Sequence, residues 1–106
     1  MNKYRVLLNG RNFVMTVDGQ PKRMGFYTTR FVEADLPEEA ESRAVQLVRE
    51  DSKLREAVLN GKTDPPMIYL QEIALLKSFR GIKLPGAGYT FYEEKGKVKE
   101  RPKRRA

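Results

Sequence analysis

The segment from Asp35 to Leu59, DLPEEAESRAVQLVREDSKLREAVL, constrains the fold most, because its apolar residues repeat at helical spacing after an acidic opening that contains proline. Asp35 is the predicted N-cap, and Glu38 completes a capping box three residues later. Pro37 falls within the first turn, where a missing N–H costs nothing. The sequence therefore predicts a main helix that begins beside Asp35.

The apolar stripe of this helix ends before the segment does. Its members, at helical spacing, are Ala40, Ala44, Leu47 and Val48. The next position in phase is Asp51, which should not be buried without a partner. We therefore expect the helix to break there, with Asp51 capping a second short helix over Lys53–Leu59 that ends at Asn60-Gly61.

The residues before this helix are typical of a β-hairpin, with a first strand from Tyr4 to Leu8. Asn9-Gly10 and Asp18-Gly19 both suit a two-residue turn, because these residues tolerate positive φ. Either three short strands meander, or Asn9-Gly10 is a bulge in one bent strand that pairs with Gly25–Ala34 across the turn Asp18–Met24. The second interpretation is favoured, because strands of similar length satisfy more backbone groups.

The strand Gly25–Ala34, GFYTTRFVEA, carries large residues on both of its faces. A sheet with one solvated face does not need this pattern. The sequence therefore predicts that the C-terminal strand, a loop or a second subunit covers part of the second face.

The C-terminal half supplies the remaining strands. Met67–Leu76 fits either a helix or a strand by periodicity, and we favour a strand that returns to the sheet after the Pro-rich connector Lys62–Pro66. Gly81–Gly88 reads as a loop, and Tyr89–Tyr92 as a short edge strand.

The predicted fold class is α+β: a small antiparallel sheet in the order β-β-α-β-β, with one main helix, broken near Asp51, packed on one face. Residues 1–94 are expected to form a single domain, and residues 95–106 a disordered basic tail. A long hairpin, one helix after a proline-marked cap and a return strand make an outline broadly similar to HicB-type antitoxins, although no motif accompanies it.

The positive charge of the chain is concentrated at its C-terminal end. The total is +7, but residues 95–106 hold seven Lys and Arg against one Glu, so residues 1–94 carry only +1. Within that part, residues 1–32 are basic and residues 33–51 are acidic. A basic end can bind nucleic acid or an acidic protein through counterion release.

Catalysis is not expected. The chain has no His and no Cys, which removes the usual general base near neutral pH and the commonest metal ligands. No pair of carboxylates has catalytic spacing, and RGIKLPGAG does not match a phosphate-binding loop. We therefore predict a non-enzyme with no catalytic residue, no cofactor and no metal.

Two classes of binding function remain. The first is contact with nucleic acid or an acidic partner through a basic hairpin and tail, helped by Phe26 and Tyr27 as stacking residues. The candidate contacts are Arg5, Arg11, Lys22, Arg23, Arg30, Lys97, Lys99, Arg101, Lys103, Arg104 and Arg105. The second class is protein interaction or homodimerisation through exposed sheet edges. No apolar run reaches the roughly 20 residues of a membrane span, so we expect a cytoplasmic protein with no membrane contact.

Overall fold

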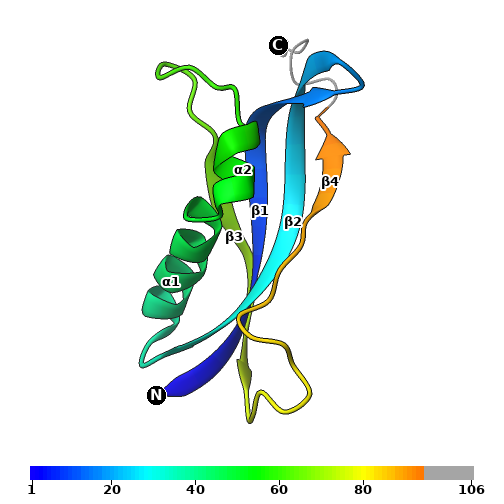
Figure 1. The fold of residues 1–106 in the computed structure, drawn as a ribbon. Coiled ribbons are helices and arrows are strands. Elements are labelled where there is room, and N and C mark those ends of the chain that lie inside the picture. Colours follow the sequence, from blue (N-terminus) through cyan, green and yellow to red (C-terminus); the bar gives the residue numbers. More distant parts are fainter. Residues whose placement is uncertain (95–106) are drawn as a thin grey trace.

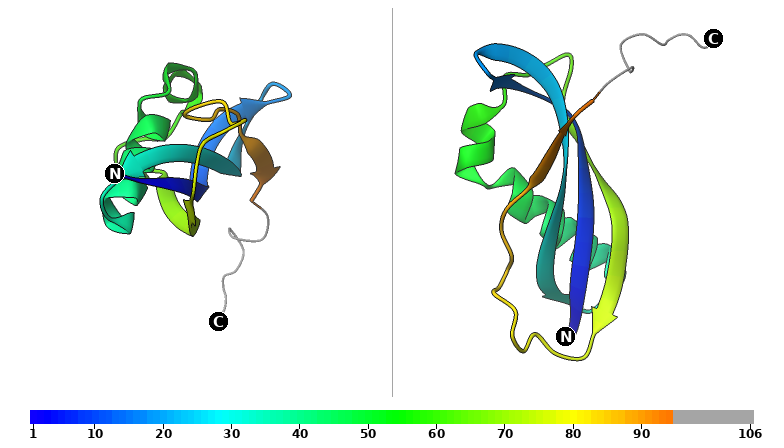
Figure 2. Two further views of the ribbon diagram at one scale, coloured as in Figure 1. Left: turned by 90° about the horizontal axis from the view of Figure 1, so that it is seen from below. Right: turned by 90° about the vertical axis from the view of Figure 1, so that its right-hand side faces the viewer.

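The computed structural model describes residues 1–94, which form a four-stranded antiparallel sheet with two helices on one of its faces (Figures 1 and 2). The α+β class predicted from the sequence is confirmed. The elements in chain order are β1 (Asn2–Val17), β2 (Gln20–Ala34), α1 (Pro37–Arg49), α2 (Ser52–Ala57), β3 (Met67–Leu76) and β4 (Thr90–Glu93). The predicted disordered tail, residues 95–106, lies outside the described residues.

β1 and β2 form the long bent hairpin that the sequence favoured. The register shifts between Gly10 and Phe13, so that Arg11 and Asn12 stand against one residue of β2, and Asn12 takes a positive φ of 63°. The bulge therefore lies just after Asn9-Gly10. The predicted turn over residues 18–24 was too long, because Asp18 (φ 52°) and Gly19 (φ 82°) close the hairpin in two residues.

The strand order across the sheet is β3-β1-β2-β4, with every neighbouring pair antiparallel. Met67–Leu76 is a strand, as predicted, and it pairs with β1 along its whole length. β4 pairs with residues 24–27 of β2 and is the short edge strand predicted at Tyr89–Tyr92, shifted by one residue. Figure 1 shows β3 and β4 on opposite sides of the central hairpin.

The start of α1 differs by one residue from the prediction. Leu36, not Asp35, is the N-cap, and Pro37 is the first helical residue. Glu39, not Glu38, closes the cap, since its Oε1 accepts from the backbone N–H of Asp35 at 3.0 Å and of Leu36 at 3.3 Å. The cause is Pro37, which holds the preceding residue in an extended conformation and so prevents an earlier helical start.

The helix breaks where the sequence requires it. Oδ1 of Asp51 accepts from the backbone N–H of Lys53 at 3.0 Å and of Leu54 at 3.4 Å, and so caps α2. The second helix is shorter than predicted, because it ends at Ala57. Leu54 is its buried residue, and Val58 packs at the margin of the core.

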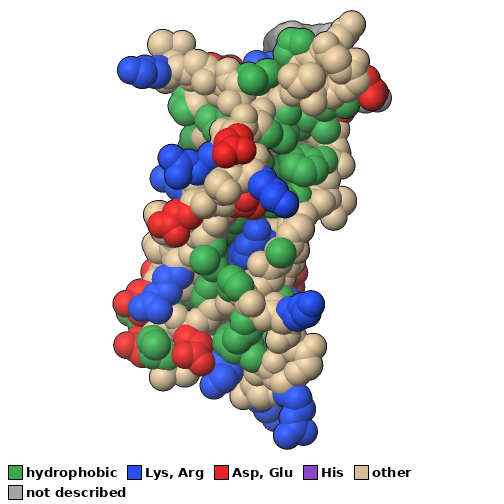
Figure 3. Space-filling view, viewed as in Figure 1, with side chains coloured by type: hydrophobic (Ala, Val, Ile, Leu, Met, Phe, Trp, Pro, Cys, Tyr) green, Lys and Arg blue, Asp and Glu red, His purple; other side chains and the backbone are tan. Residues whose placement is uncertain are grey.

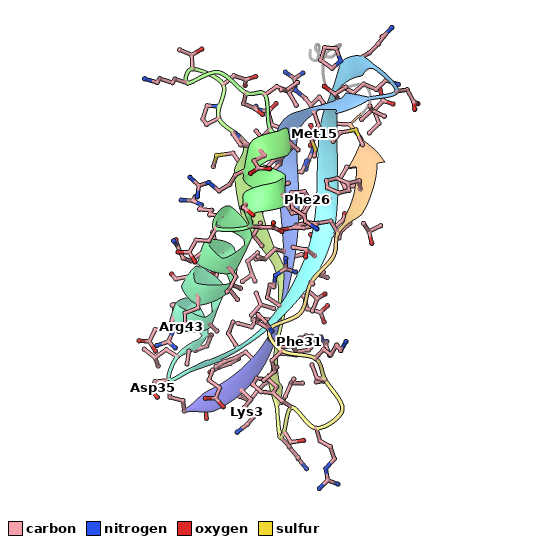
Figure 4. All side chains as sticks on the ribbon, viewed as in Figure 1. Lys3, Met15, Phe26, Phe31, Asp35 and Arg43 are labelled. Atoms are coloured by element: carbon pink, nitrogen blue, oxygen red, sulfur yellow. The ribbon has the colours of Figure 1, made fainter. Side chains whose placement is uncertain are left out.

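The core lies between the helices and one face of the sheet. The small residues Ala40 and Ala44 are fully buried, which brings α1 close to the strands, and Leu47 of the predicted stripe is half-buried. Under α2, the ring of Phe26 is fully buried (Figure 4). No helix among residues 1–94 is long and apolar enough to cross a membrane.

Candidate interaction surface

The two faces of the sheet differ because both helices lie on one of them (Figure 2). The buried residues Val6, Leu8 and Phe26 point toward the helices, so their neighbours in sequence point to the other side. We call this other side the helix-free face. Its residues, taken from the strand register, include Lys3, Arg5, Leu7, Asn9, Tyr27, Thr29, Phe31, Tyr69, Glu72, Ala74 and Tyr92.

Three tyrosines lie at the bulge end of the helix-free face. The side chains of Tyr27 and Tyr69 are 40% and 49% exposed, and the ring centroids of Tyr27 and Tyr92 are 5.5 Å apart. Asn9, buried beneath them, donates to the Tyr92 hydroxyl at 2.9 Å and to the Phe26 carbonyl at 3.0 Å. The cluster is therefore fixed from below while two of its rings stay accessible.

The opposite end of this face is partly covered by the loop between β3 and β4. The ring of Phe79 packs edge-to-face on Phe31 with centroids 6.3 Å apart, and the Lys3 ammonium lies 6.0 Å from the Phe79 ring. Together with Tyr92, this loop supplies the cover that the two-sided sequence of Gly25–Ala34 predicted.

The same loop protects one long edge of the sheet. The backbone N–H of Phe31 donates to the Pro85 carbonyl at 2.8 Å, and the Thr28 hydroxyl donates to the Gly88 carbonyl at 2.6 Å. This part of β2, which β4 does not reach, therefore has hydrogen-bond partners in the loop.

The outer edge of β3 has no strand beside it among the described residues. Its apolar side chains are unusually open, with Leu75 66% and Met67 46% exposed, and Leu70 is also exposed. Because β3 contributes to both faces, these side chains border the core on one side and the tyrosine cluster on the other. The edge and the helix-free face make one continuous surface.

The predicted cationic hairpin surface is largely neutralised. Four of its five cations face a carboxylate: Arg5 with Glu72 (3.9 Å), Arg11 with Glu94 (2.9 Å), Lys22 with Glu93 (3.9 Å) and Arg23 with Asp64 (3.5 Å). The structure brings Arg11 and Arg23 together at the bulge and leaves Arg5 on the helix-free face. The other predicted contacts, at residues 97–105, lie outside the described residues.

Arg30, the fifth cation, is only 4% exposed and points toward the helices. Its guanidinium donates to the hydroxyls of Thr28 and of Tyr89, the latter at 3.2 Å, and Tyr89 donates to Oδ2 of Asp51 at 2.7 Å. This chain of bonds ties β2 to the start of α2. Phe26, the predicted stacking residue, is likewise in the core, so neither is placed to touch a partner.

Hydrogen bonding and burial set the ionisation of this group of residues. The bond from Tyr89 lowers the pKa of Asp51, with the two capping N–H groups acting in the same direction. Burial, followed by the bond to Asp51, raises the pKa of Tyr89 to about 12. Tyr89 is thus a neutral donor at physiological pH, which suits a structural role.

A second polar cluster fixes the bulge. Oε2 of Glu94 accepts from Nε of Arg11 at 2.9 Å and from the backbone N–H of Asn12 at 3.0 Å, and the hydrogen bond with Glu94 raises the pKa of Arg11. The Asn12 side chain bridges Arg23 and Asp64 at 2.6 and 2.9 Å. These contacts attach the last described residue and the Pro-rich connector to the hairpin.

On the helix side, α1, α2 and the connector enclose a groove of about 460 Å³ lined by apolar residues with Arg49 and Arg55. Figure 3 shows a mixture of apolar residues and charged residues of both signs on the helix side of the molecule. Residues 1–94 contain no group of His, Cys, Asp and Glu arranged to hold a metal ion. We find no convergent polar groups in the groove that specify a ligand.

Sequence reasoning missed Tyr69 and Tyr92 as surface residues. Tyr92 lies beside Tyr27 because residues 90–93 pair with residues 24–27, and Tyr69 lies beside Asn9 through the β1–β3 register. The only signal in the sequence was the composition of these two strands, since the register of the sheet depends on bulges in β1 and β3 that the sequence does not locate to the residue.

Comparisons with protein-family models, with curated proteins and with solved structures find no match to this chain. The likeness of its outline to HicB-type antitoxins therefore stays a prediction, and the argument about function rests on the surface itself.

Proposed function

We propose that this protein is a non-catalytic interaction module that binds another protein chain along the outer edge of β3. The observation that supports the proposal is a ten-residue strand, Met67–Leu76, whose outer backbone groups have no neighbouring strand among residues 1–94. An added strand would satisfy these groups, and the exposed apolar side chains on both faces would contribute to affinity.

The amino-acid composition of β3 favours pairing with another strand, because it lacks the residues that commonly prevent such pairing. Edge strands that must stay solitary are commonly blunted by Lys, by Pro or by an inward-pointing charge. β3 contains none of Lys, Arg or Pro, and its single charged residue, Glu72, faces Arg5. The opposite side of the sheet, by contrast, is occupied by β4 and the loop before it.

Site-specific photocrosslinking tests the proposal. A photoreactive phenylalanine analogue replaces Tyr69, which is already aromatic and half-exposed, and a control protein carries it at Leu59, which is exposed outside the sheet. We expect a discrete protein adduct on irradiation in cells from position 69 and not from position 59. An unmodified chain from both positions would refute use of the β3 edge.

A second candidate function is binding of single-stranded nucleic acid across the helix-free face. The observation that favours it is the cluster of Tyr27, Tyr69 and Tyr92, which offers stacking surfaces, in a chain whose residues 95–106 carry a net charge of +6. The hairpin cations contribute less to this candidate than predicted, since they are paired with carboxylates or buried.

Fluorescence anisotropy with a labelled single-stranded oligouridylate tests this second candidate. Binding should weaken steeply with salt and on removal of residues 95–106, while Tyr27→Ala should remove about 1–3 kcal/mol of stacking. Affinity unchanged by both alterations would eliminate the candidate. The predictions of a non-enzyme and of a cytoplasmic location stay predictions.

A further inference from the structure

We propose that the chain bound by β3 is β3 of a second copy, paired antiparallel about a two-fold axis through the middle of the strand. This inference rests on the proposed function and specifies its partner. It predicts a closed dimer with one continuous eight-stranded sheet, which is within the usual size range of sheets.

The sequence of β3 has the symmetry that such a dimer needs. Four apolar residues, MIYL, precede the central pair Gln71-Glu72, and four apolar residues, IALL, follow it. Antiparallel self-pairing therefore places apolar residues of one copy opposite apolar residues of the other, and polar residues meet only at the axis.

The bulge in β3 makes the pairing consistent on both faces. The register against β1 shifts between Leu7 and Leu8, so that Gln71 is an extra residue in β3. Side chains before and after it consequently alternate in opposite phase. Cross-strand partners must lie on the same face of a sheet. In a regular strand, a symmetric pairing of Met67–Leu70 with Ile73–Leu76 would put partners on opposite faces, and the extra residue in β3 brings them to the same face.

With Gln71 of both copies outside the ladder, as it is in the pairing with β1, the two-fold axis passes beside Glu72. Glu72 then lies opposite Glu72 of the second copy, Ile73 opposite Leu70, and Ala74 opposite Tyr69. From the β1 register, Ile73 and Leu70 lie on the helix face, because they pair with Val6 and Leu8. Ala74 and Tyr69 lie on the helix-free face, because they pair with Arg5 and Asn9, so this register keeps like faces together.

The charges at the axis are complementary when Arg5 is included. Two Glu72 carboxylates opposite one another would repel, but each already lies 3.9 Å from the guanidinium of its own Arg5. Both side chains are substantially exposed, so they have room to rearrange. The two copies together form a neutral group of two Arg and two Glu, and Arg5→Ala should weaken dimerisation.

Disulfide trapping tests the register directly, because the natural chain has no Cys. Glu72→Cys puts one thiol beside its symmetry mate and should give nearly complete disulfide-linked dimer under mild oxidation. Glu56→Cys on the exposed side of α2 is the control and should stay monomeric in non-reducing gels. Equal, slow cross-linking of both variants would refute the register.

Sedimentation equilibrium tests the dimer without any cross-link. Wild type should sediment at twice the chain mass, and Leu75→Lys, which alters an exposed residue opposite Ile68 of the second copy, should weaken association about a hundredfold. Leu59→Lys, a matched exposed position outside the sheet, should behave as wild type. A wild-type monomer at all concentrations, or open-ended polymers, would overturn the proposal.

The photocrosslink at position 69 separates the two levels of the argument. An adduct of twice the chain mass supports both the proposed function and the dimer. An adduct of any other mass refutes self-pairing as the use of this edge but leaves the proposed function in place. The absence of any adduct would refute both the proposed function and the dimer.

Discussion

Gly10→Ala probes how tightly the hairpin packs on the core. A Cβ built on Gly10 would lie 2.4 Å from two atoms of the Phe26 ring, where van der Waals contact between carbons requires about 3.5–4.0 Å. The ring must therefore move by roughly 1 Å. Three other rings pack around it, those of Phe13, Tyr89 and Phe91, with centroids 4.8, 4.9 and 5.7 Å away.

Overpacking of this kind costs about 1–3 kcal/mol, and replacing Gly by Ala in an unstrained strand returns about 0.4–1 kcal/mol through the unfolded state. Because the overlap is about 1 Å, we expect an overpacking cost in the upper part of this range, about 2–3 kcal/mol, and a net loss in the free energy of unfolding of about 1–2.5 kcal/mol. For a domain of this size, that lowers Tm by about 5–15 °C. Urea denaturation and thermal melts followed by circular dichroism measure both quantities.

Gly61→Ala is the matched control, because a Cβ there meets nothing within 4 Å and the residue does not have a positive φ. It should be neutral or slightly stabilising. If Gly10→Ala were as stable as this control, the close approach of Phe26 to β1 would be wrong, and with it the packing that fixes the faces of the sheet.

Three further predictions concern α1 and its junction with α2. Ala44→Leu should cost about 1–3 kcal/mol in urea denaturation, since Ala44 is fully buried against the sheet, whereas Ser42→Leu on the exposed side should cost little. Tyr89→Phe should lose about 1–3 kcal/mol, because it leaves buried Arg30 short of an acceptor. Its wild-type hydroxyl has a folded pKa of about 12 against about 10 unfolded, so that contribution is present below pH 10 and disappears as pH rises through 12; the Phe variant should lack this alkaline slope in pH-dependent denaturation. Asp51→Asn keeps a capping oxygen but removes the charge whose pKa is lowered in the fold. Wild type should therefore be more stable than this variant above about pH 4, and its advantage should vanish as pH falls further; equal acid limbs would contradict the role of the carboxylate.

The start of α1 could be predicted to within one residue, and the difference has a local cause. Asp35 resembles an N-cap by residue type, but Pro37 as the first helical residue makes Leu36 the N-cap. Glu39 then reaches both free N–H groups. The break at Asp51 was predictable because burying an unpaired carboxylate is more costly than ending a helix.

The strand Gly25–Ala34 and its two apolar faces were also predictable, but the sequence did not show which face lies against the helices. Phe26 and Tyr27 are equally aromatic, and nothing in the local sequence says which of them meets the helices. The assignment follows from the burial of Phe26 under α2, which also sends Arg30 inward to Thr28 and Tyr89. The contacts predicted from the sequence therefore included Arg30, which is part of the core.

The two outer edges of the sheet differ in how well they are covered, and this difference points to β3 as the interaction edge. β2 is longer than β3 and also carries large apolar residues, but β4 pairs with its residues 24–27, and the loop before β4 accepts hydrogen bonds from Thr28 and Phe31. Among residues 1–94, β3 has neither kind of cover at its outer edge, and Gln71 forms a bulge in it. In the proposed dimer, the extra residue brings Met67–Leu70 of one copy and Ile73–Leu76 of the other onto common faces, so a second copy of β3 fits this edge. Under the proposed self-pairing, the bulge is thus the feature that lets the apolar halves of two β3 strands face one another.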